Sequence, residues 1–323
     1  MVIVCGVLTG LNKGVFTECS GLKEVYISKN IRTIEERTFF GCDQLKKIRL
    51  PSGLKEIGYL ALADCTSLTE LDVPETVTEI GFDALRGVPW FENQTNEFVL
   101  INSVLARYCG NAEILRETDF NLKIESVAGG AFRNTKLKEI YFPDRIGYIG
   151  AHPFFRCEAL EKVKLPSGME CIPEGCFSGI SSLKEIIVGN NVKTLKEGSF
   201  RDTSLTYLSV WDGVTTIDRF ALFSESFKSI VLPETIEVIH KQAFYRCHES
   251  YPYHLNIFYK GSEIKWQRFI EKNGDDFLYG KISVYFYSES KPVENRVYWH
   301  WVNGEPVIWE ISETGESGSE NAA

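Results

Sequence analysis

The fold is decided by the stretch FFGCDQLKKIRLPSGLKEIG, residues 39–58. Within it, Ile48 and Leu50 lie two residues apart, directly before a proline. Side chains alternate between the two faces of a strand, so Ile48 and Leu50 point to one face while Lys47 and Arg49 point to the other. Proline has no N–H group to continue a ladder of backbone hydrogen bonds, so we expect the strand to end there. The stretch therefore predicts a short strand with one buried and one exposed face.

The same spacing of apolar residues recurs along the chain with a period of 22 or 23 residues. The first two copies place apolar residues at Leu22, Val25, Ile27, Ile31, Ile34 and Phe39, and at Leu45, Ile48, Leu50, Leu54, Ile57 and Leu62. Further copies begin at Leu68, Leu115, Leu137, Leu160, Leu183, Leu205 and Phe227, and Thr118 is the one polar residue on this grid. Because one coil cannot bury its own apolar side chains, we expect successive coils to stack about 4.8 Å apart, the spacing of paired strands.

The turn over residues 39–58 resembles the BspA-type leucine-rich repeat of bacterial surface proteins, and the resemblance covers about residues 1–250. It implies a mainly β, right-handed leucine-rich repeat solenoid of about ten coils of 22–23 residues, with a concave sheet. Adhesion or binding roles are commonly assigned in that family. The resemblance therefore implies a non-catalytic interaction or adhesion scaffold that is secreted or at the cell surface, without specifying its partner.

The repeat is interrupted near residues 88–111. Two extended apolar pieces flank Asn102 and Ser103, which predicts a hairpin that projects from the rod. This hairpin is either a structural flap over one edge or a binding protrusion.

The grid extends to the first residues, so Met1 falls inside a coil and no polar cap precedes it. Solenoids need polar ends to protect the first coil, so we expect further residues upstream or a truncated reading frame. The first residues also lack the basic start and processing site of a signal peptide.

The composition changes after the repeats, and residues 251–310 are rich in aromatic side chains. Strands are predicted at Leu255–Tyr259 and at 282–287, a short helix at 262–272, and a hairpin that turns at Asn303 and Gly304. We expect the rod to end near residue 250 and this region to cap it. The alternative is a glycan-binding module that uses Trp299, Trp301 and Trp309, since tryptophan stacks on apolar faces and keeps a polar group. Residues 311–323 are polar and acidic, which is typical of a disordered tail.

Composition and charge exclude several function classes. The chain has 323 residues, 44% of them hydrophobic, and a formal net charge of −9. No run of eighteen apolar residues is present, so no membrane-spanning helix is predicted. Nucleic acid is disfavoured as a partner because binding phosphates needs clustered lysine and arginine.

The sequence contains little that indicates chemistry. Cys19, Cys42, Cys65, Cys157 and Cys247 recur at one position of the repeat, which predicts structural free thiols, although stacked cysteines could also form disulfides. Cys5, Cys109, Cys171 and Cys176 lack metal-ligand spacing, and Cys247, His248 and His254 are a weak metal candidate. No catalytic or cofactor-binding motif is found, so we expect neither an enzyme nor a cofactor.

The outward side of the strands is the candidate protein-binding surface, which we expect to be concave. The residues proposed to contact a partner there are Tyr26, Arg49, Glu70, Asp72, Tyr141, Lys162, Lys164 and Tyr207. Tyrosine and arginine often anchor protein interfaces. The alternative is a solvated face whose opposite charges pair between coils. Glu70 and Asp72, with Glu117 and Asp119 on the same side, would repel a polyanion.

Overall fold

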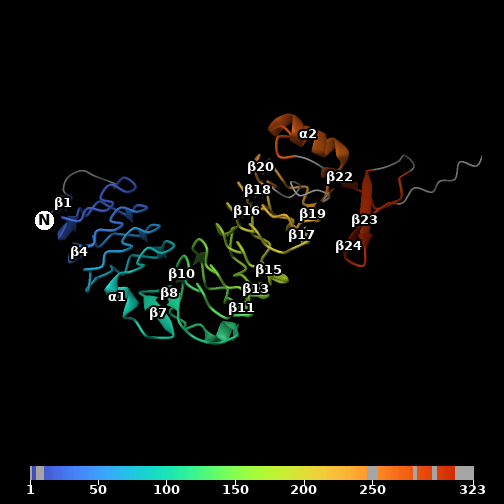
Figure 1. Ribbon diagram of the computed structural model, residues 1–323. Coiled ribbons are helices and arrows are strands. Elements are labelled where there is room, and N and C mark those ends of the chain that lie inside the picture. Colours follow the sequence, from blue (N-terminus) through green and yellow to red (C-terminus); the bar gives the residue numbers. More distant parts are fainter. Residues whose placement is uncertain (1, 5–10, 246–253, 279–281, 293–296, 310–323) are drawn as a thin grey trace, which may run out of the picture.

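The computed structural model describes residues 2–4, 11–245, 254–278, 282–292 and 297–309. Figure 1 shows stacked coils that run through a bend near α1 (Pro89–Glu92) and continue to β24 (Glu305–Ile308). Met1, Cys5, Cys247, His248 and the tail at 311–323 lie outside the described residues.

Most coils contain a longer strand whose outward side forms what we term the long-strand face. The inward residue of β4 is buried and its two neighbours are exposed, as the alternation predicts. The longer strands pair in parallel with those of adjacent coils. They are β1 (Val2–Val4), β2 (Glu24–Ile27), β4 (Lys47–Arg49), β11 (Glu139–Tyr141), β13 (Lys162–Lys164), β15 (Glu185–Ile187), β17 (Tyr207–Ser209) and β19 (Ser229–Leu232), and the two-residue strand β9 (Ile114–Leu115) occupies the same position in its coil.

A two-residue strand follows in each coil, and these strands form the short-strand face. They are β3 (Thr33–Ile34), β5 (Glu56–Ile57), β6 (Glu79–Ile80), β10 (Ser126–Val127), β12 (Tyr148–Ile149), β14 (Cys171–Ile172), β16 (Thr194–Leu195), β18 (Thr216–Ile217) and β20 (Val238–Ile239). Ile57, Ile149 and Ile239 each end such a strand and each is buried. Ile57 pairs with the equivalent residues of the coils on both sides, Ile34 and Ile80. The predicted mainly β solenoid is therefore confirmed.

The grid assigned from sequence is wrong in one coil. The repeat pattern aligns Leu115 with Leu137, whereas in the structure Leu115 pairs with Ile140, three positions later. Glu117–Asp119 form a short 3₁₀-helix, η1, in which Asp119 accepts a hydrogen bond from the Arg116 backbone N–H at 2.7 Å. The polar residue Thr118 thus lies outside the strand, and its neighbours do not belong to the sheet.

The predicted hairpin is present but does not project. It consists of β7 (Phe98–Ile101) and β8 (Val104–Tyr108), which pair antiparallel across a turn where Asn102 has φ 56°. Its second strand also pairs in parallel with β10, so the hairpin extends the sheet of the short-strand face. The side chains of Val104, Leu105 and Ala106 are buried there.

The insertion bends the solenoid because it separates the coils on one side only. On the short-strand side, Gly129 N–H donates to the Ile80 carbonyl at 2.9 Å, so coils on either side of the insertion touch directly. A Cβ atom at Gly129 would lie 2.4 Å from the Phe82 backbone nitrogen, so glycine permits this approach. Figure 1 shows the two arms meeting here, with β16, β18 and β20 inside the angle and β11, β13 and β15 outside. The long-strand face, expected to be concave, therefore lies on the outside of the bend.

The sequence predicted that the solenoid ends near residue 250, but the sheet continues beyond that point. β21 (Leu255–Tyr259) pairs in parallel with β19, and β22 (Ile282–Tyr287) and β23 (Tyr298–Val302) continue the sheet. β24 pairs antiparallel with β23, which confirms the predicted hairpin at Asn303 and Gly304. The final strands thus extend the long-strand face.

The predicted helix is α2 (Glu263–Asn273), whose first turn is capped by the Ser262 hydroxyl accepting from the Lys265 backbone N–H. Its buried residues Trp266 and Phe269 pack with Phe277, which in turn contacts Phe244 of the last regular coil. The expected aromatic cluster is thus present and covers the core beneath α2.

Replacing Gly129 by alanine will destabilise the bend. We expect Gly129→Ala to reduce the free energy of unfolding by about 1–3 kcal/mol, because the new methyl group meets the Phe82 backbone, which cannot move independently. Gly147→Ala is the control, since nothing lies within 4 Å of its Cβ position, and it should be neutral or stabilise by up to about 1 kcal/mol. Urea unfolding measures both, and equal losses would contradict the close approach.

Candidate functional site

The predicted partner-binding residues on the N-terminal arm form one local stack. The Arg49 guanidinium lies 5.3 Å from the centre of the Tyr26 ring, which is its neighbour on the adjacent strand. Glu70 and Asp72 are exposed in the next coil, where the structure assigns no strand. This arm therefore presents one stacked pair beside two carboxylates.

The predicted residues of the C-terminal arm pair with other coils. Lys162 lies 5.8 Å from the Tyr141 ring centre and forms a 2.8 Å ion pair with Glu185. Lys164 forms an ion pair with Glu117. Both cations are thus neutralised locally, as expected of a solvated face.

Tyr207 lies farther along the same face, half-buried against a small hydrophobic cluster formed by Val231, Phe258 and Trp299. The eight predicted residues are therefore spread over both arms. The structure does not bring them into one site.

The three tryptophans proposed for glycan binding do not form one surface. Trp299 is fully buried, and its indole N–H donates to the Tyr259 carbonyl at 3.0 Å. Trp301 is partly exposed beside it. Trp309 instead stacks on His300, with ring centres 3.6 Å apart, and alternation along β23 places His300 on the opposite side from Trp301.

The cysteines serve the fold. All seven cysteines within the described residues are free. Free thiols were expected for the four of them at the repeat position, Cys19, Cys42, Cys65 and Cys157. The thiols of Cys42, Cys65 and Cys157 donate to the carbonyls of Phe16, Phe39 and Phe132 in the preceding coil. Burial raises the pKa of Cys65 to about 12, so this thiol stays protonated and is a poor nucleophile.

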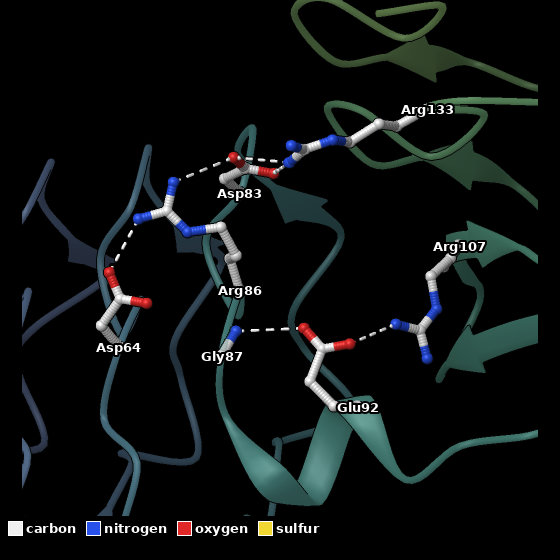
Figure 2. A network of polar contacts seen from close by, with 7 residues as sticks. All are labelled: Asp64, Asp83, Arg86, Gly87, Glu92, Arg107 and Arg133. Atoms are coloured by element: carbon white, nitrogen blue, oxygen red, sulfur yellow. Dashed lines mark hydrogen bonds and ion pairs between the residues drawn. The ribbon is translucent and has the colours of Figure 1, made fainter. Parts of the chain in front are cut away.

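A polar network holds the two arms together at the bend (Figure 2). Asp83 accepts from Arg133 at 2.8 and 2.9 Å, although these residues are 50 positions apart. Arg86 forms ion pairs with Asp83 at 3.4 Å and with Asp64 at 2.7 Å. Asp83 therefore links its own coil to one beyond the insertion.

A second part of this network anchors the insertion itself (Figure 2). Glu92 of α1 accepts from the Gly87 backbone N–H at 3.0 Å and pairs with Arg107 at 2.7 Å. Arg107 also donates to the carbonyls of Phe91 and Gln94. Its Nε is buried without a hydrogen-bond partner.

These groups line a cavity of about 560 Å³, which we term the arginine cavity. Arg86, Arg107, Arg133 and Lys136 contribute positive charge, while Asp83 and Glu92 contribute negative charge. A second cavity of about 510 Å³ lies between the arms and is lined by residues such as Tyr59, Phe82 and His152. The bend thus offers two concave surfaces, which suit the binding of a partner.

Sequence reasoning missed the residues of this network. The break in the repeat was the available signal for the bend, because an insertion must be anchored to the coils that it separates. Nothing in the spacing identifies Asp83 and Arg133 as partners, since ordinary neighbours in the solenoid are 22 or 23 residues apart. Within the described ranges, no group of three potential ligands could hold a metal ion, and no helix is long and apolar enough to cross a membrane.

The chain matches the family described as the BspA type leucine rich repeat region, in six copies over residues 7–97, 104–226 and 216–264. The gap between the first two segments falls at β7 and the hairpin turn. No curated protein sequence matches significantly.

Several solved structures are similar to the chain. A leucine rich cell surface protein from Faecalibacterium prausnitzii is 23% identical, with a TM-score of 0.42, over 81% of this chain and 65% of that one. A leucine-rich repeat protein from Bacteroides ovatus is 19% identical, with a TM-score of 0.32, over 78% and 59%. One from Eubacterium ventriosum is 18% identical, with a TM-score of 0.40, over 77% and 83%. The chain therefore covers less than two thirds of the first two.

Removing the charge of Asp83 will weaken the bend. Asp83→Asn keeps the side-chain shape and the tolerance of positive φ but leaves Arg133 without its carboxylate, so we expect stability to fall by about 1–2 kcal/mol. Asp202→Asn is the matched control, because Asp202 has the same φ of 53° but, among the described residues, forms an ion pair only with the adjacent Arg201. Thermal unfolding measures both, and equal shifts would contradict the linking role.

Thiol alkylation will separate buried from exposed cysteines. Iodoacetamide at pH 8 should modify the exposed Cys109 in the folded protein and leave Cys42, Cys65 and Cys176 unmodified until urea unfolds the chain. Peptide mapping by mass spectrometry gives the extent at each position. Rapid modification of Cys65 in the folded protein would contradict the hydrogen-bonded core position.

Proposed function

Since the chain belongs to the BspA-type leucine-rich repeat family, we propose that it is a non-catalytic scaffold that binds a protein partner through the surface of its repeats. A solenoid has no central cleft, because its interior is filled by stacked apolar residues. Its long outer surface is available for binding instead.

The fixed bend is the observation that carries this proposal. Asp83 joins Arg133 across the insertion, and Gly129 joins Ile80 by a backbone hydrogen bond. Both contacts hold the arms at a set angle. The scaffold therefore loses little conformational freedom when a partner binds between the arms. The two cavities beside the bend support this location.

An adhesion role outside the cell accords with the family. The similar protein from Faecalibacterium prausnitzii is described as a cell surface protein. We extend that location to this chain as part of the proposal. The glycan alternative has less support, because Trp299 is buried and Trp301 and Trp309 face different sides of β23.

Binding to a panel of extracellular matrix proteins, measured by surface plasmon resonance, tests the proposal. We expect saturable binding to at least one member, weakened tenfold or more by Lys136→Glu in the arginine cavity or by Tyr59→Ala between the arms. Both residues are exposed, so the fold should persist.

Lys164→Glu on the long-strand face is the control and should change the dissociation constant less than twofold. Binding lost in this variant alone would place the partner on the long-strand face instead of at the bend. Absence of binding to every panel member would count against the adhesion role.

A further inference from the structure

The cavity between the arms, which we term the inner cleft, lies on the short-strand side of the bend. Tyr59 and Glu56 line it from the N-terminal arm, while Tyr148, His152 and Glu174 line it from coils beyond the insertion. Phe82 lies at the junction, 5.3 Å from the His152 ring and 5.4 Å from the Phe155 ring. The cleft exists because the bend brings these coils together.

The walls of the inner cleft are aromatic. Tyr59 stacks against Phe82 with ring centres 6.1 Å apart and an angle of 16° between the planes. Tyr59 is 38% exposed, although Phe82 stacks on its ring and the Arg37 guanidinium lies over it. The Arg37 guanidinium already lies 5.8 Å from the Tyr59 ring centre, which shows that this ring accepts a cation.

The inner cleft also gathers carboxylates: Glu56 and Glu174 line it, and the Glu174 carboxylate lies 3.7 Å from the His152 Nε2. Glu79 lies beside the cleft, directly opposite Glu56 on the adjacent strand, and no ion pair to either is found among the described residues. Like charges in this position destabilise a sheet. Burial, followed by the charges of Glu79 and Glu35, raises the pKa of Glu56.

Basic groups also lie near the inner cleft. Arg37 lies over the Tyr59 ring and Arg156 over the Phe155 ring, and Arg133 forms an ion pair with Asp83. Burial raises the pKa of Tyr148 to about 12, and the carboxylates of Glu79, Glu56 and Glu174 add to that effect from both arms. Carboxylates of both arms are therefore close enough to act on the same group, the Tyr148 hydroxyl.

We propose that the inner cleft holds a lysine or arginine side chain presented by the protein partner, an inference that rests on the proposed function. The aromatic walls would contact the alkyl stem and the cation, while Glu56 and Glu174 would neutralise the charge. The like-charge pair Glu56 and Glu79, which weakens the free protein, gains its missing cation when the partner binds.

A basic protein segment fits better than a free metal ion. Metal ions prefer convergent oxygen ligands, whereas aromatic rings favour organic cations. The cleft also joins both arms on the inside of the bend, where a protruding segment of a partner would be held from two sides.

Isothermal titration calorimetry with tetralysine and tetraarginine tests the inference. We expect saturable binding by the wild-type protein and at least tenfold weaker binding by the double variant Glu56→Gln with Glu174→Gln. The matched control is Glu237→Gln with Glu197→Gln, which removes the same charge from exposed positions outside the cleft and should change affinity less than twofold.

A stability measurement separates a binding role from a structural one. Glu56→Gln alone should raise the midpoint of thermal unfolding, because it removes like-charge repulsion, while it weakens peptide binding. A carboxylate that supports the fold would give a lower midpoint, which would overturn the inference.

Other arms of the titration identify the ligand. Equal affinity of both double variants, tighter binding of spermidine than of tetralysine, or binding of calcium chloride alone would each overturn the inference. If the double variant of Glu56 and Glu174 still binds the matrix protein as tightly as the wild type does, the inference about the inner cleft is contradicted, while the proposed function stands. If the wild-type protein binds tetralysine but no member of the matrix-protein panel, the proposed function is contradicted instead.

Discussion

Each coil of this solenoid buries its apolar residues only by stacking on the coils beside it. Ile57 is buried because Ile34 lies on one side and Ile80 on the other. The same constraint sets the cysteine ladder, where the thiols of Cys42, Cys65 and Cys157 donate to carbonyls of the preceding coil and so satisfy polar groups within the core. Stability is therefore a sum of contacts between neighbours, and any interruption must be compensated locally.

The insertion is the place where that constraint is hardest to meet. Its second strand, β8, remains in the stack by pairing with β10, while its helix and first strand occupy the outer side. On the inner side the missing coil is replaced by a direct backbone contact at Gly129 and by the Asp83 to Arg133 ion pair. The bend is thus the result of continuous stacking on one side and an added layer on the other.

Period and alternation could be predicted from the sequence because they depend on local spacing. The positions of Ile48 and Leu50 specify a buried strand face, and Ser262 followed by an amphipathic segment specifies a capped helix. The coil at Leu115 was assigned wrongly because the grid tolerates a shift of three residues, whereas the pairing with Ile140 does not. The aromatic C-terminal region looked like a separate cap because its spacing is irregular, yet its strands continue the sheet.

The candidate sites were less predictable, because they depend on which coils the bend brings together. Side chains chosen along the long-strand face are neighbours in the repeat, so their charges are satisfied there, as with Lys162 and Glu185. Glu56 and Glu79, in contrast, have no ion pair among the described residues. They oppose each other on adjacent strands of the short-strand face, and this repulsion destabilises the sheet. Its presence beside accessible aromatic rings argues that this part of the solenoid is adapted to a ligand more than to stability.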